Sequence, residues 1–190
     1  KLNDVFKIVK DFKKSKHAKP LILMGYFNLI LQYGQISFLK HCKKVGVDGL
    51  IIVDLPHPEN KLFANQCKKY SVNFIQLVSP TTTIERVKKI IKDSHDMVYY
   101  ISMLSTTGGK LKVSPKKILK NYKLIKKINP KKNLVIGFGI TIKTIGSLKS
   151  TDGLVVGSQL CNEITRSLKL RQNPVTNLVR MVHNLKKEII

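Results

Sequence analysis

Six short apolar runs alternate with amphipathic, lysine-rich stretches along the chain. Most of these runs are near-continuous series of β-branched or aliphatic residues, the composition of parallel strands that are buried on both faces. Successive runs begin roughly 20 to 36 residues apart, which matches the length of a βαβ unit. We therefore predict strands at residues 20–26, 49–54, 73–78, 97–102, 133–138 and 153–156.

The stretches between the runs carry apolar residues at helical spacing rather than in alternation. One helix is predicted close to the first residue and ends before Pro20, and another begins at Pro174. Four more helices are predicted over residues 36–45, 62–67, 84–91 and 118–128.

Two architectures place helices between parallel strands. An open doubly wound sheet usually begins with a glycine-rich turn of the GxGxxG kind, and the sequence contains none. We therefore predict an α/β fold, a (β/α)8 TIM barrel represented by about six of its eight βα units, which forms a single incomplete domain over residues 1–190. Because the first residue is Lys1 rather than Met, we interpret the chain as the C-terminal part of a longer protein whose N-terminal units are missing.

The formal net charge of +24 raises nucleic acid or another anionic surface as a partner. Between Met97 and Thr151 there is no Asp or Glu, but the lysines there alternate with aliphatic residues, as on the wet face of an outer barrel helix. No nucleic-acid-binding motif accompanies them. We therefore interpret the lysines as a solvated face and expect no nucleic acid as a partner.

The three cysteines stand singly, without CxxC pairs or metal-ligand spacing to the five histidines. This pattern predicts neither a disulfide framework nor a metal site, and it favours a reducing, cytoplasmic setting. No apolar run approaches the roughly 20 residues that span a bilayer, so we expect no membrane segment.

Glycines follow the last two predicted strands. Because active sites of such barrels lie at the C-terminal ends of the strands, Gly137, Gly139, Gly157 and Ser158 would together offer backbone N–H groups and a hydroxyl to a phosphate. The alternative is that these glycines only serve tight turns or close packing. The polar stretch 105–110 follows another strand and suits a mobile lid over the phosphate.

Several segments resemble, in order, the α subunit of tryptophan synthase. They are residues 23–28 (LMGYFN), 46–56 (GVDGLIIVDLP), 98–102 (VYYIS), 107–108 (TG), 137–140 (GFGI) and 157–158 (GS). The resemblance implies a lyase that cleaves indole-3-glycerol phosphate to indole and glyceraldehyde 3-phosphate in tryptophan biosynthesis. It implies no cofactor in this chain, and an α2β2 complex with a β subunit that carries pyridoxal phosphate.

The resemblance also assigns residues. The substrate-binding residues it implies are Met24, Ile51, Val53, Leu77, Tyr99, Thr107, Gly108, Gly137, Phe138, Gly139, Gly157 and Ser158. Among them Gly108, Gly139, Gly157 and Ser158 would hold the phosphate, and the apolar residues would surround the indole. The residues it implies for the β-subunit interface are Tyr26, Asn28, Asp54 and Pro56.

The catalytic carboxylates of the family are the principal departure. The Glu and Asp belong to the second strand and to the loop after it, and we expect both to lie upstream of Lys1, so that no catalytic residue falls in this chain. Of the eleven acidic residues, Asp54 ends a strand, and we expect it to orient a loop or face the partner rather than to act in catalysis. His57, in a strand-end loop, is a weak candidate.

Two other functions are weighed against the lyase. A truncated, non-catalytic phosphate-binding barrel could serve as a partner-binding module. A sugar-phosphate epimerase would require metal-binding histidines after several strands, and the sequence has none there.

Overall fold

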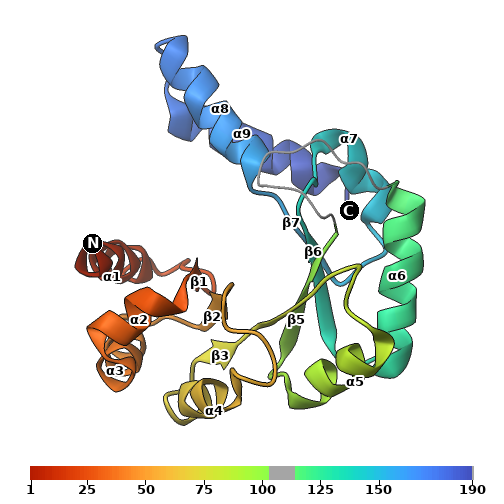
Figure 1. The fold of residues 1–190 in the computed structure, drawn as a ribbon. Helices are drawn as coiled ribbons and strands as arrows, with labels where there is room; N and C mark the ends of the chain where they lie inside the picture. Colours follow the sequence, from red (N-terminus) through yellow and green to blue (C-terminus); the bar gives the residue numbers. More distant parts are fainter. Residues whose placement is uncertain (103–113, 190) are drawn as a thin grey trace. The chain divides into compact units, whose positions relative to one another are not determined.

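The computed structural model describes residues 1–102 and 114–189. The chain forms two compact units, one of residues 1–77 with 92–97 and the other of residues 78–91 with 98–190. Each unit alternates strands with helices (Figure 1). No described helix has both the length and the apolar character needed to cross a membrane.

The first unit holds a parallel three-stranded sheet. Its elements are α1 (Leu2–Lys13), β1 (Ile22–Gly25), α2 (Phe27–Tyr33), α3 (Gln35–Val45), β2 (Gly49–Ile52), α4 (Lys61–Lys69) and β3 (Asn73–Phe74). The strand order is β1-β2-β3, with Met24 opposite Ile51 and Leu50 opposite Phe74.

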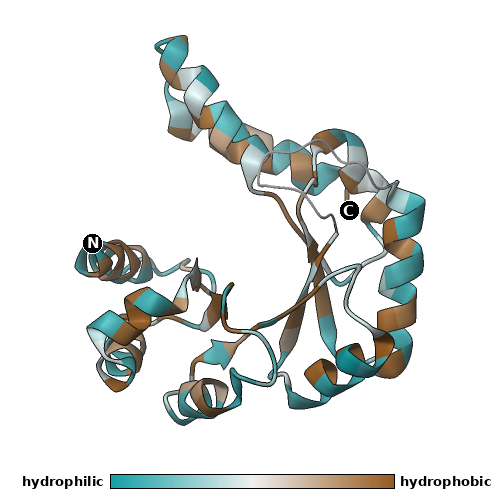
Figure 2. Ribbon diagram, viewed as in Figure 1, coloured by the Kyte–Doolittle hydropathy of each residue, from teal (hydrophilic) through white to brown (hydrophobic). Residues whose placement is uncertain are grey.

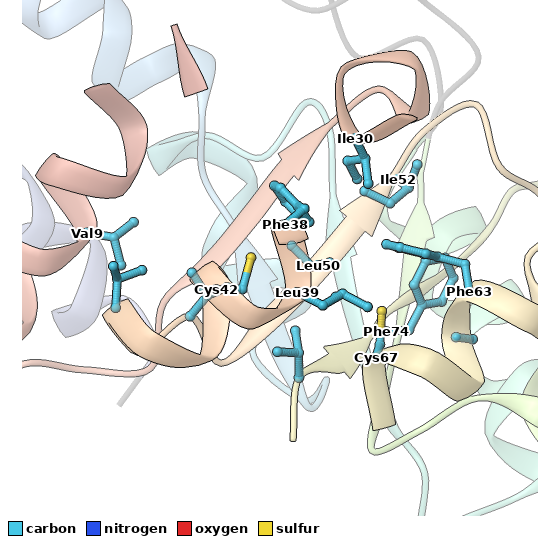
Figure 3. Packing of buried hydrophobic residues seen from close by; sticks show 14 of the residues in the cluster. Val9, Ile30, Phe38, Leu39, Cys42, Leu50, Ile52, Phe63, Cys67 and Phe74 are labelled. Carbon is cyan, nitrogen blue, oxygen red and sulfur yellow. The ribbon is translucent and has the colours of Figure 1, made fainter. Parts of the chain in front are cut away.

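Helices α1, α3 and α4 pack on one face of this sheet through an apolar cluster. Figure 3 shows Leu39 and Cys42 of α3 beside Leu50 of β2, and Phe63 of α4 near Phe74. Both Cys42 and Cys67 lie in this core as free thiols. Burial raises the pKa of each thiol to about 12, so both stay protonated and unreactive at neutral pH.

The second unit holds a four-stranded sheet in the order β4-β5-β6-β7, in which β6 and β7 are parallel. Its elements are β4 (Gln76–Val78), whose first two residues fall in the first unit, α5 (Ile84–Asp93), β5 (Met97–Ile101), α6 (Pro115–Ile128), β6 (Asn133–Gly137), α7 (Ile142–Ile145), the 3-10 turn η1 (Gly146–Leu148), β7 (Gly153–Val155), α8 (Ser158–Lys169) and α9 (Pro174–Lys187). Figure 2 shows apolar strands and two-sided helices, and the strand residues Val98, Tyr100 and Ile136 belong to the core.

All six predicted strands are present, with one division. The run 73–78 forms β3 and β4, which pair in different sheets on either side of Ile75. Helices α2, α7 and α8 were not predicted. The described chain forms two compact units. That residues 1–190 make up a single domain stays a prediction.

A lysine–aspartate pair ties the start of β1 to the start of β2. The carboxylate of Asp48 accepts hydrogen bonds from Lys13 Nζ at 2.6 Å and from the N–H of Leu21 at 2.6 Å. Lys13 Nζ also donates to the carbonyl of Lys19. This Lys13–Asp48 clamp joins the end of α1 to both strands.

The same arrangement recurs in the second unit. The carboxylate of Asp152 accepts from Lys126 Nζ at 2.9 Å and from the N–H of Leu134 at 2.8 Å. Lys126 Nζ donates to the carbonyl of Lys132, six residues on, just as Lys13 does to Lys19. This Lys126–Asp152 clamp joins the end of α6 to β6 and β7.

Both clamps make stability depend on pH. Burial works to raise the pKa of Asp48 and Asp152, but the lysine and backbone hydrogen bonds outweigh it and lower both below 3.8. A carboxyl whose pKa is lowered by folding stabilises the protein above its unfolded-state pKa, and this contribution is lost as the pH falls through the folded-state pKa.

We predict that the double variant Asp48→Asn/Asp152→Asn is less stable at pH 7 by about 1 to 3 kcal/mol, allowing for the partial exposure of Asp48. The difference from the wild type should shrink as the pH falls from 5 to about 3. Urea unfolding over that pH range tests this. Asp11→Asn, which removes an exposed helix pair with Lys14, serves as the control and should change little. Equal stability of the double variant and the wild type at pH 7 would contradict the prediction.

Candidate functional site

The turn after β6 has a strained backbone. Phe138 and Gly139 both adopt the left-handed conformation, with φ of 70° and 68°. For Phe138 this conformation is uncommon and costs free energy, because a Cβ crowds the backbone there. Strain of this kind is typical of functional turns that the surrounding structure holds in place.

Ser102, directly after β5, holds this turn. Its hydroxyl lies 2.8 Å from the carbonyl oxygen of Gly137 and 2.6 Å from that of Phe138, and its N–H donates to Gly137 as well. Ser102 is completely buried. Sequence reasoning placed Ser102 at a strand end but assigned it no role, although a hydroxyl that ends an apolar strand was a usable signal.

Tyr99 of β5 occupies the space that a side chain at residue 137 would need. A Cβ at Gly137 would lie 1.7 Å from the hydroxyl oxygen of Tyr99, so no other residue fits without displacing that ring. The ring of Tyr99 meets that of Phe138 edge-on, with centroids 6.3 Å apart. Burial raises the pKa of Tyr99 to about 12, so the phenol stays neutral at physiological pH. The two rings therefore form an uncharged aromatic wall beside the turn.

Gly157 and Ser158 lie where β7 passes into α8. Gly157 is the N-cap of α8, and its φ of −117° is open to other residues. No described atom lies within 4 Å of a Cβ placed on Gly157. Packing against the described residues therefore does not require a glycine at this position. The first turn of α8 leaves the N–H groups of Ser158 and Gln159 outside the helical hydrogen-bond ladder, where they can serve an anion.

Two of the predicted apolar residues of the first unit share one face of its sheet. Met24 and Ile51 are paired across β1 and β2, and the alternation of side chains turns them away from the core residues Leu50 and Ile52. Val53 lies just beyond the end of β2, in the turn that follows it, and is exposed. Leu77 lies separately in β4, at the boundary between the units.

The four predicted interface residues are exposed at the strand ends of the first unit. Tyr26 precedes α2 and Asn28 lies within it, while Asp54 and Pro56 follow β2. The carboxylate of Asp54 accepts the N–H of Phe27 at 2.7 Å and so caps α2 from the neighbouring loop. This agrees with the expectation that Asp54 orients a loop.

His57, the weak catalytic candidate of the sequence, has a structural role in the loop after β2. His57 is buried and lies 2.8 Å from the carboxylate of Asp93, which also pairs with Lys61 at 3.0 Å. This ion-paired cluster anchors the loop after β2.

Thr107 and Gly108, with the predicted lid, lie outside the described residues. Among the described residues no group of histidine, cysteine or acidic side chains could hold a metal ion.

All eleven carboxylates lie within the described ranges 1–102 and 114–189. Asp48 and Asp152 belong to the clamps at the N-terminal ends of strands, and Glu163 pairs with Arg166 within α8. Asp54 and Glu59 are in the loop after β2, where Asp54 caps α2.

Comparisons with known proteins agree with one another. The family model of the tryptophan synthase alpha chain matches residues 1–190. The tryptophan synthase alpha chain of Pelagibacter ubique strain HTCC1062 is 70% identical over 189 residues, which cover 100% of this chain and 71% of that protein. That of Legionella pneumophila strain Corby is 33% identical, over 98% of this chain and 69% of that protein.

Solved structures show the same likeness. The crystal structure of tryptophan synthase subunit alpha from Legionella pneumophila strain Paris has a TM-score of 0.88 at 31% identity, covering 98% of this chain and 69% of that one. A tryptophan synthase complex from Pyrococcus furiosus gives 0.84 at 29% identity, covering 98% and 74%. These neighbours confirm the predicted partial (β/α)8 barrel.

Replacing Gly137 and replacing Gly157 should affect stability to different degrees. We expect Gly137→Ala to destabilise the protein by about 1 to 3 kcal/mol, because the new methyl overlaps the Tyr99 hydroxyl. Gly157→Ala should change the free energy of unfolding by no more than about 0.5 kcal/mol, because its methyl meets open space. Chemical denaturation of the two variants measures both effects, and equal losses would contradict this account.

Proposed function

This chain belongs to the tryptophan synthase alpha chain family, and we propose that its strand ends bind indole-3-glycerol phosphate for cleavage to indole and glyceraldehyde 3-phosphate. The enzyme is a lyase of tryptophan biosynthesis. The observation that supports the assignment to these residues is Gly157, the N-cap of α8, where an added Cβ would meet no described atom within 4 Å, so that the space beside it is open to a ligand.

The phosphate would bind at the turn of Gly137, Phe138 and Gly139 together with the start of α8. The left-handed turn exposes backbone groups, and α8 brings the positive end of its dipole with the hydroxyl of Ser158. All these residues lie in the second unit. Gly108 would add a further backbone group.

The indole would be held by apolar contacts. Tyr99 and Phe138 supply an aromatic pair whose geometry suits a flat ring. Met24, Ile51 and Val53 supply an apolar strip on the first unit, and Leu77 a further residue on β4. Burial raises the pKa of Tyr99 to about 12, so the wall beside the indole is uncharged at physiological pH.

Cleavage of the carbon–carbon bond needs a general acid to protonate the indole carbon and a base to remove a proton elsewhere. Four carboxylates of this chain have structural roles: Asp48 and Asp152 in the clamps, Glu163 in its ion pair and Asp54 as a cap. We propose that the residues of this chain bind and orient the substrate, and that the Glu and Asp expected upstream of Lys1 transfer the protons.

The proposed partner is the β subunit of tryptophan synthase, in an α2β2 complex. The exposed end that carries Tyr26, Asn28, Asp54 and Pro56 would meet it. Pyridoxal phosphate would belong to that subunit, with no cofactor in this chain. The cytoplasm is the proposed location, in keeping with three free cysteines.

The alternative, a non-catalytic phosphate-binding module, differs in what precedes Lys1. The coding sequence upstream of Lys1 decides between the two. Two further βα units with a Glu on the second strand and an Asp in the loop after it would establish the lyase. A stop codon or unrelated sequence would exclude catalysis and leave the binding role.

If Gly157 lies against the phosphate, replacing it should weaken phosphate binding. In the full-length gene product, we expect Gly157→Ala to weaken binding of glycerol 3-phosphate at least about tenfold, because its methyl occupies the space of the phosphate. Gly146→Ala, at a glycine with helical φ and ordinary contacts, is the control. Isothermal titration calorimetry measures both, and unchanged affinity in Gly157→Ala would refute the proposed site.

If Asp54 holds the end that meets the β subunit, replacing it should weaken binding of that subunit. Asp54→Ala removes the acceptor for the N–H of Phe27 and loosens the start of α2, at a cost of about 1 kcal/mol. We expect the affinity for the β subunit to fall about fivefold. Asp54→Asn keeps an acceptor oxygen and should stay closer to the wild type. Surface plasmon resonance with the β subunit tests this, and equal affinity of Asp54→Ala and the wild type would contradict it.

A further inference from the structure

The side chain of Gln159 connects the segment after β6 to the start of α8. Gln159, the second residue of α8, accepts through Oε1 the N–H of Ile142, the first residue of α7, at 2.9 Å. Ile142 follows the Gly137–Gly139 turn by three residues, and Gln159 follows Gly157 by two. The hydrogen bond therefore joins the two segments assigned to the phosphate.

The local structure of α7 leaves this N–H available. Thr141 and Thr144 form two hydrogen bonds with each other at the start of α7. The N–H of Thr141 donates to Thr144 Oγ1, and the N–H of Thr144 donates to the carbonyl of Thr141. The N–H of Ile142 lies at the first helical position, which has no intrahelical acceptor. Gln159 supplies that acceptor from another helix.

The turn is thus held from two sides. Ser102 fixes its beginning through the carbonyls of Gly137 and Phe138, and Gln159 fixes its end through Ile142. Ser102 ties the turn to β5, whereas Gln159 ties it to α8. The pairing of Gly137 with Val155 brings the two segments side by side, and the Gln159 contact adds a second link beyond the ends of the strands.

We propose that Gln159 is a positioning residue for the substrate phosphate, a role that rests on the proposed function. A dianion held by donors from two segments binds more tightly when their separation is fixed beforehand, since less conformational freedom is lost on binding. The glutamine is uncharged, so it provides an acceptor beside the site without repelling the phosphate.

The test uses the full-length gene product in complex with its β subunit. Gln159→Met keeps the length of the side chain and removes the acceptor. Asn162→Met, at an exposed position about one turn further along α8, is the matched control. Three quantities are measured: the dissociation constant for glycerol 3-phosphate, KM and kcat for indole-3-glycerol phosphate, and amide hydrogen exchange at Ile142.

For Gln159→Met we expect KM and the dissociation constant to rise about threefold to tenfold, the effect of one lost hydrogen bond. The value of kcat should stay within about twofold, because the proton-transfer groups are untouched. The Ile142 amide should exchange faster than in the wild type and in Asn162→Met. A merely structural role would lower thermal stability without this separation of KM from kcat.

The outcomes are distinct. Binding of glycerol 3-phosphate by the wild type with equal affinity in Gln159→Met would overturn the positioning role and leave the proposed function standing. A fall in kcat at unchanged KM would also overturn it. No binding by the wild type would refute the proposed function and the positioning role together.

Discussion

The Lys–Asp clamp is the interaction on which the arrangement of strands and helices depends in both units. In each case an aspartate that precedes one strand binds the N–H at the start of the neighbouring strand and a lysine from the end of a helix. The carboxylate thereby fixes strand register and helix position at once. Both clamps lie at the N-terminal ends of the strands, so the C-terminal ends are left to loops that carry function.

At the C-terminal ends the glycines differ in why they are required. Gly137 makes room for Tyr99, and Gly139 adopts a positive φ, so both are explained by the chain itself. Gly157 is explained by neither cause. Turns and packing account for the first two glycines, and the proposed phosphate would use the open space beside the third.

The sequence predicts the strands well because each buried strand is a continuous apolar run. It does not predict the division at Ile75, because the run continues where the pairing partner changes. Helix α2 was missed because Leu29, Ile30 and Leu31 are adjacent rather than at helical spacing. The roles of Ser102 and Gln159 depend on contacts with residues 35 and 17 positions away, which no local pattern encodes.

The charged groups of the chain have two kinds of role, attraction of the phosphate and support of the fold. The excess of lysine and arginine gives a field that attracts a phosphate dianion and raises its local concentration. Asp48 and Asp152 are held at low pKa in the clamps, Asp54 serves as a cap, and Tyr99 stays neutral. In the proposed function the described residues hold the substrate in position, so that the acid and base groups proposed upstream of Lys1 would meet the scissile bond already aligned.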